Sequence, residues 1–184
     1  MKRILSLVCV MMLAIAASAQ ITWNAKGGLG VATMWGSGNE ISKTHIVAKA
    51  GVGIEYPLSS NLSLMPSLEF AWKGCKLFET GTLDLYYLQV PVVLAYRFNV
   101  ADAWNITVKA GPYVAYAISD HYKFDSGDSG SIGAKKFDAG LDAGIDFEYH
   151  RFVFGVEAEM GFLKLTSVDY IKNLAFYGTI GWKF

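Results

Sequence analysis

The chain has few cysteines, few prolines and few charged residues. Of its 184 residues two are cysteine, four are proline and 17% are charged. Cys9 lies in the apolar start of the chain and leaves Cys75 alone, which excludes a disulfide scaffold. The formal net charge is zero, so the basic footprint of a nucleic-acid-binding protein is missing. The low charge also argues against an ordinary water-exposed surface, which is usually about 25–35% charged.

Beyond its first twenty residues the chain has no apolar run long enough for a membrane-spanning helix. The start is different: Lys2 and Arg3 precede an apolar run from residue 4 to residue 16, followed by Ala17-Ser18-Ala19. A charged start, an apolar centre and a small-x-small site are typical of a secretory signal peptide. We therefore expect residues 1–19 to be cleaved and residues 20–184 to form one exported domain.

The remaining sequence alternates between apolar and polar or small residues. In residues 137–149, for example, Phe137, Ala139 and Leu141 alternate with Asp138 and Gly140, and a period of two indicates a β-strand. Eight such segments are predicted, at residues 21–33, 45–56, 62–73, 85–98, 104–119, 137–149, 152–163 and 174–184. Short links alternate with long ones, and the longest is 120–136. This arrangement is typical of outer-membrane β-barrels, whose short turns face the periplasm.

Two barrels of opposite polarity fit eight alternating strands: a soluble lipocalin-like barrel with its apolar face inside, or a transmembrane barrel with that face outside. The interior of eight strands is only wide enough for side chains to fill it. Aromatic residues such as Trp72, Trp104 and Trp182 crowd one face, whereas ten glycines lie on the other. Because the small residues must occupy the narrow interior, we predict an all-β, eight-stranded antiparallel up-and-down transmembrane barrel.

This polarity places charges of both signs inside the barrel, where an unpaired charge is very costly. We therefore predict a closed, salt-bridged lumen with a structural role, although a narrow channel for small solutes is an alternative. The predicted network consists of Lys26, Lys49, Glu55, Glu69, Lys73, Arg97, Lys109, Asp138, Asp142, Asp146, Glu148, Glu157, Glu159 and Lys183.

Three stretches carry a family resemblance: YLQVPVVLAYRF (87–98), GPYVAY (111–116) and the terminal GWKF. They resemble the small outer-membrane β-barrel family of Bacteroidota that includes PorT-like proteins, a porin-family outer-membrane β-barrel domain. The family often has Glu where this chain has Gln89. The resemblance implies an outer-membrane location in a Gram-negative bacterium, a link to secretion, and recognition of the C-terminal aromatic Phe184, with Trp182 in support, by the outer-membrane assembly machinery.

We expect a structural or interaction protein that acts through extracellular loops, above all residues 120–136. Its expected partners are outer-membrane lipid, the assembly machinery and a protein bound at the loops, and we expect a monomer without a cofactor. No catalytic residue is predicted. A lipid-modifying enzyme is a third hypothesis, because Ser119, Asp120 and His121 provide the residue types that such chemistry uses. The three histidines have no metal-ligand spacing, so no metal site is expected.

Overall fold

The computed structural model describes residues 21–36, 42–77, 81–124, 129–130, 136–163 and 171–184. In these ranges no helix is long and apolar enough to cross a membrane. Eight long strands occur: β1 (Thr22–Gly36), β3 (His45–Pro57), β4 (Leu62–Leu77), β5 (Gly81–Ala101), β6 (Trp104–Phe124), β8 (Phe137–Tyr149), β9 (Phe152–Gly161) and β10 (Ile171–Lys183). Two further strands have two residues each, β2 (Ser42–Lys43) and β7 (Ser129–Gly130). The predicted signal peptide lies outside the described residues.

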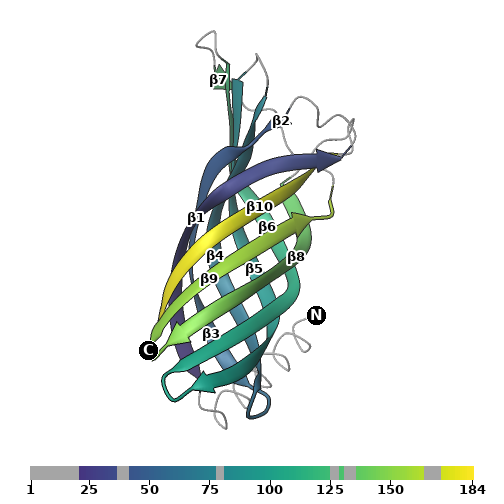
Figure 1. The fold of residues 1–184 in the computed structure, drawn as a ribbon. Coiled ribbons are helices and arrows are strands. Elements are labelled where there is room, and N and C mark those ends of the chain that lie inside the picture. Colours follow the sequence, from purple (N-terminus) through teal and green to yellow (C-terminus); the bar gives the residue numbers. More distant parts are fainter. Residues whose placement is uncertain (1–20, 37–41, 78–80, 125–128, 131–135, 164–170) are drawn as a thin grey trace, which may run out of the picture.

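The eight long strands form one closed antiparallel barrel (Figure 1). Each strand pairs with its neighbour in the chain, and β1 closes the barrel by pairing with β10 from Asn24 opposite Lys183 to Gly36 opposite Ile171. Closure leaves no free edge in the barrel wall, a necessity in hydrocarbon, where no water can satisfy backbone groups. The predicted fold class is confirmed.

Three tight turns and both ends of the described chain lie at one end of the barrel (Figure 1). The turns connect β3 to β4, β5 to β6 and β8 to β9, as the sequence predicts. His150, in the β8–β9 turn, has a φ of 53°, which is the left-handed conformation that tight turns require. The other ends of the long strands lie at the opposite end, which corresponds to the extracellular end in outer-membrane barrels.

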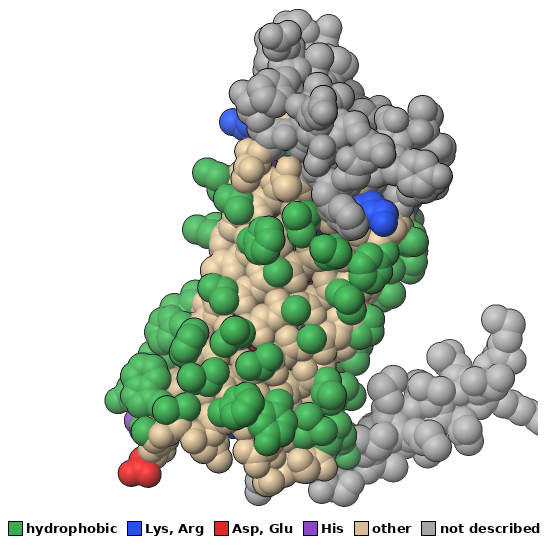
Figure 2. All heavy atoms as spheres, turned by 45° about the vertical axis from the view of Figure 1, so that its right-hand side comes forward, with side chains coloured by type: hydrophobic (Ala, Val, Ile, Leu, Met, Phe, Trp, Pro, Cys, Tyr) green, Lys and Arg blue, Asp and Glu red, His purple; other side chains and the backbone are tan. Residues whose placement is uncertain are grey.

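The two faces of the wall have opposite chemistry. On β8 and β9, Leu141 and Phe154 are 47% and 45% exposed, whereas the neighbouring Asp142 and Glu157 are 1% and 2% exposed. Figure 2 shows apolar side chains over the whole visible height of the wall. The lipocalin-like alternative is therefore wrong, because the apolar face points outward and most ionic groups lie inside.

Glycine explains how the interior fits so many long side chains. A Cβ atom on Gly140 would collide with the Met160 carbonyl oxygen, and one on Gly30 with the Phe176 carbonyl oxygen. Gly178 points outward, and a Cβ there would approach nothing closer than 3.9 Å. Glycine is thus required at these two inner positions, whereas the outer position of Gly178 has room for a Cβ.

The strands extend further at the extracellular end than the alternation predicts. β5 and β6 have 21 residues each, and the additional pairs include Asp84 opposite His121. Leu83, Asp84 and Leu85 are all buried, so the alternation that reveals a strand in lipid is lost where the sheet leaves the bilayer. The prediction of a loop over residues 120–136 is therefore wrong for residues 120–124, which belong to β6, and for Ser129–Gly130, which form β7.

Candidate functional site: the charged lumen

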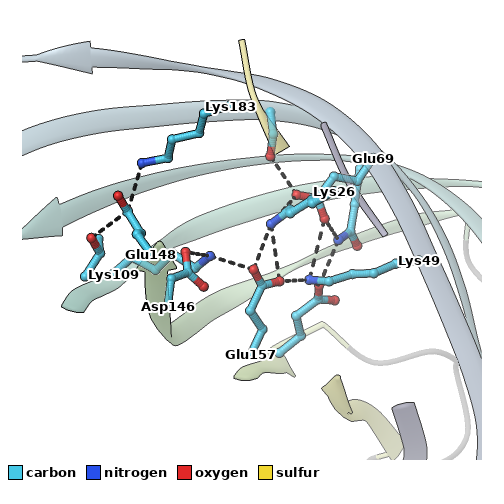
Figure 3. A network of polar contacts seen from close by, with 12 residues as sticks. Lys26, Lys49, Glu69, Lys109, Asp146, Glu148, Glu157 and Lys183 are labelled. Atoms are coloured by element: carbon cyan, nitrogen blue, oxygen red, sulfur yellow. Dashed lines mark hydrogen bonds and ion pairs between the residues drawn. The ribbon is translucent and has the colours of Figure 1, made fainter. Parts of the chain in front are cut away.

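Glu157, on β9, is the hub of the lumen. Its carboxylate lies 2.9 Å from Lys26 Nζ of β1 and 2.7 Å from Lys109 Nζ of β6, and it also pairs with Lys49 of β3. Figure 3 shows these lysines converging on the carboxylate from different strands. One acid thus joins three parts of the wall, because an eight-stranded lumen is narrow enough for side chains to reach across it.

Glu159 and Glu69 make further ion pairs with the lysines of this network and add Lys73 to it. Glu159 lies 2.9 Å from Lys49 Nζ and 2.7 Å from Lys73 Nζ, and Glu69 lies 2.9 Å from Lys26 Nζ. Asp146 pairs with Lys109 at 2.5 Å. Four lysines therefore face four acids in a group that we call the central cluster: Lys26, Lys49, Lys73, Lys109, Glu69, Asp146, Glu157 and Glu159.

A second group, the rim cluster, consists of Glu55, Arg97, Glu148 and Lys183 at the short-turn end of the lumen. Lys183 Nζ lies 2.8 Å from both carboxylates, and Arg97 lies 2.5 Å from Glu55 and 3.3 Å from Glu148. Ser63 and Thr107 donate hydroxyl hydrogen bonds to Glu55 and Glu148, respectively. These contacts form a closed ring of two cations and two acids.

Twelve of the fourteen predicted lumen residues form these two clusters, and two do not. Asp138 accepts hydrogen bonds from Tyr113 Oη at 3.1 Å and Asn173 Nδ2 at 2.9 Å. Asp142 is buried, and its Oδ1 has no hydrogen-bond partner in the described structure. It lines a cavity of about 40 Å³ between the clusters, a volume suited to a few water molecules. Both acids thus lie in the lumen, but neither belongs to the ion pairs of the two clusters.

Sequence reasoning missed the neutral side chains of the lumen because it collected only charged ones. Gln89 Nε2 donates to Glu69 at 3.1 Å and to Glu159 at 2.9 Å. The Tyr113 ring lies under Lys73 Nζ, 4.4 Å from the nitrogen, and the Tyr177 ring lies under Lys49 Nζ, 4.7 Å from it. All three occupy inward positions of the two-residue alternation, so that same pattern could have identified them.

The lumen is thus filled rather than open. Lys49, Lys73 and Lys109 are at most 5% exposed, as are Glu69, Glu157 and Glu159. Among the described residues no group of three or more His, Cys, Asp or Glu side chains is placed to hold a metal ion. Chemically, the arrangement can hold eight strands in register by charge pairing. We find no wide aqueous path in the part of the lumen that the structure describes.

The other predicted residues lie outside the lumen. Ser119 Oγ lies 3.1 Å from His121 Nδ1 near the extracellular end. At the opposite end, Trp182 and Phe184 are exposed on the outer face, and the Phe184 N–H donates to the Trp23 carbonyl at 2.8 Å. Cys75 lies inside β4, completely buried in an apolar cluster, because β4 continues to Leu77, past residue 73 where the third predicted strand ends.

Three solved structures illustrate what the chain is similar to. Neisserial surface protein A has 10% identity and a TM-score of 0.56, with 88% of this chain and 97% of that chain covered. The outer membrane enzyme PagL has 13% identity and a TM-score of 0.53, with coverages of 88% and 98%. Ail, the attachment invasion locus protein of Yersinia pestis, has 13% identity and a TM-score of 0.50, with coverages of 89% and 98%. At these identities the likeness concerns the fold alone.

Sequence comparison assigns the family. No curated protein matches the chain. The family model described as "Outer membrane protein beta-barrel domain" matches residues 16–167, well over half of the sequence. The match agrees with a closed barrel that has an apolar outer face and a charged interior. The chain therefore belongs to the outer membrane protein beta-barrel domain family and is a small, eight-stranded outer-membrane barrel.

Proposed function

We propose that the protein is a structural or interaction component of the outer membrane, with a barrel that anchors and presents its extracellular end. The observation that carries this proposal is the pairing of Glu157 with three lysines in the middle of the lumen. A pore would need these side chains to separate, which would leave charges unpaired in a narrow space. The barrel then serves as a scaffold, and the extracellular connections serve as the binding part.

Planar-bilayer recording tests the closed lumen. Purified, refolded wild-type protein is expected to give no discrete conductance steps, because no continuous water column passes the central cluster. A Glu157→Ala variant that still folds is the matched comparison, since it removes the hub and adds space. Discrete steps from the wild-type protein would favour the alternative function, a narrow channel for small solutes.

The interaction role needs a partner, and affinity capture from outer membranes in mild detergent would detect one. We expect a partner that is retained by the full chain and lost when residues 125–136, beyond the end of β6 at Phe124, are replaced by a short glycine–serine linker. The resemblance to PorT-like proteins adds secretion as the specific role to test, by measuring exported proteins in a deletion strain. A barrel that captures nothing reproducibly, with unchanged secretion, would contradict the proposal. We further propose that the protein is a monomer and that the outer-membrane assembly machinery recognises Phe184, with Trp182 in support.

One observation favours a second function, lipid modification. Ser119 and His121 are hydrogen-bonded on the outer side of β6, where a register shift lies between Tyr86 and Tyr87 of the adjacent β5. A Ser–His pair can form the nucleophile and base of a hydrolase. If this function were correct, expression would change the mass of lipid A or phospholipid, and His121→Ala would abolish the change whereas His150→Ala at the other end would not. We propose the non-enzymatic role because the carboxylate opposite His121, that of Asp84, is engaged by other groups: it accepts a hydrogen bond from Trp72 Nε1 at 2.9 Å and lies 3.2 Å from His45 Nε2.

A further inference from the structure

The backbone pairing of the barrel wall is uneven. Five of the eight interfaces between long strands, among them β1–β10 and β8–β9, are paired without interruption. The other three, β3–β4, β4–β5 and β5–β6, each lose two consecutive pairs in mid-strand, although the register is the same on both sides of the interruption. These three interfaces are neighbours in the wall, so the weakly paired part is one continuous area.

A proline lies in each interruption. Pairing is lost at Pro66 between β3 and β4, at Pro91 between β4 and β5, and at Pro112 between β5 and β6. Proline has no backbone N–H and cannot donate to the ladder, so in sheets it is usually confined to edge strands and bulges. Three prolines on adjacent strands therefore weaken one side of the barrel, an area that we call the proline patch.

The proline patch lies between the bilayer and the cavity of the lumen. Backbone in a membrane can remain unpaired only where it is buried in protein or lines a cavity. Met65, Pro91 and Val93 line the cavity between the central and rim clusters, as does Pro66. On the outer face of the same patch, Leu68 and Val90 are exposed. A single layer of interrupted strands thus separates the cavity from lipid.

The opposite side of the cavity carries an acid in excess. Asp142 lines the cavity, is 1% exposed, and has no partner for its Oδ1 among the residues that the structure describes. The three lysines that line the cavity are already engaged, because Lys26, Lys109 and Lys183 each pair with two carboxylates. A buried charge without a partner is very costly, so the cavity favours a positively charged ligand at Asp142.

The size of the cavity narrows the class of cation. A volume of about 40 Å³ suits a group no larger than a few water molecules. A primary ammonium group meets this condition, whereas a quaternary ammonium, with its three methyl groups, is too bulky. An ammonium group also donates hydrogen bonds, and a charge-assisted bond to a carboxylate is among the strong ones.

The position of the proline patch indicates where this ligand comes from. Pro66 lies four residues from the start of β4 at Leu62, which is roughly 13 Å along the strand, or about 9 Å above the short turns at a tilt near 45°. The patch therefore faces the periplasmic leaflet. We propose that the proline patch is a lateral binding site through which an amphiphile of this leaflet places a primary ammonium group beside Asp142. Entry from the side leaves the barrel closed along its axis.

Native mass spectrometry of the refolded mature barrel tests the class of ligand. The probes are dodecylamine, dodecyltrimethylammonium and dodecanoic acid, which have comparable apolar chains and different head groups. We expect a retained adduct with dodecylamine alone. In Asp142→Asn the Kd should be at least about tenfold weaker, because the amide keeps the shape and loses the charge.

Asp138→Asn is the matched control, because Asp138 is equally buried but accepts its hydrogen bonds from Tyr113 and Asn173. This variant should bind dodecylamine as the wild-type protein does, and heat-modifiable migration on gels confirms that both variants are folded. Absence of a dodecylamine adduct would overturn the proposal. Equal adducts with either of the other probes would overturn it too, as would equal loss in both asparagine variants.

Hydrogen–deuterium exchange of the wild-type barrel in phospholipid nanodiscs tests the lateral entry. Residues 90–93 of β5, in the proline patch, should exchange faster than residues 143–146 of β8, which are paired on both sides. Local opening of the wall exposes backbone amides to exchange, and bound dodecylamine should slow it in β5 only. Equal protection of the two segments would contradict a lateral site, and so would exchange in β5 that dodecylamine leaves unchanged.

Discussion

The central and rim clusters use the same chemistry at different distances from water. In the central cluster three lysine side chains are at most 4% exposed and only that of Lys26 reaches 17%. In the rim cluster the side chains of Lys183 and Arg97 are 10% and 28% exposed. Buried charge pairs lose their hydration and depend on one another, whereas exposed pairs can exchange a partner for water. The two groups therefore differ in what the loss of one partner costs, although each is balanced in charge.

The largest effect is expected for Glu157→Gln in the central cluster. The substitution keeps the shape and removes the charge, so three lysines lose their shared partner. Breaking a buried ion pair in this way destabilises by about 3–5 kcal/mol. Urea-induced unfolding of the barrel in phospholipid vesicles, followed by tryptophan fluorescence, measures the free energy. A loss below about 1 kcal/mol would show that the centre of the lumen is wetted as the rim is.

Gln89→Glu adds a fifth acid beside the central cluster without removing any of its members. Gln89 donates one hydrogen bond to Glu69 and one to Glu159, and a carboxylate at this position would repel both. We expect a loss on the order of 1–3 kcal/mol in the same unfolding experiment. Gln89→Met, which only removes the hydrogen bonds, is the control and should cost less. An unchanged stability in Gln89→Glu would mean that the cluster accepts a fifth acid.

The sequence predicts the barrel well because lipid imposes a strict alternation on every residue that it touches. Leu141 and Asp142 reveal their faces by type alone, and all eight long strands follow from that pattern. The pairing partners do not follow from it, because the contact between Lys26 and Glu157 depends on the register and curvature of the closed wall. Nor does alternation reach above the bilayer, where β5 buries Leu83, Asp84 and Leu85 in succession. The candidate lumen residues were thus predictable, whereas their division into two clusters was not.

The rim cluster should tolerate the loss of a member. Glu55→Gln leaves Lys183 and Arg97 with Glu148, 2.8 and 3.3 Å away, and the part-exposed Arg97 can turn toward water. We expect a loss of about 1 kcal/mol, measured as for Glu157→Gln. If Glu55→Gln lowered the free energy of unfolding as much as Glu157→Gln does, water would be excluded equally from both clusters. The proposed difference between them would then be wrong.

Salt provides the smallest and most specific test of the contrast. Raising the salt concentration from about 0.1 M to about 1 M shortens the Debye length from about 10 Å to about 3 Å, which weakens exposed pairs much more than buried ones. The stability difference between wild type and Glu55→Gln should therefore shrink by a few tenths of a kcal/mol, because one partner of Glu55, Arg97, is part-exposed and open to screening. The difference for Glu157→Gln should stay constant, since mobile ions cannot enter a lumen filled by side chains. Parallel shrinkage in both variants would mean that salt reaches the central cluster, and the same access would then be open to small solutes.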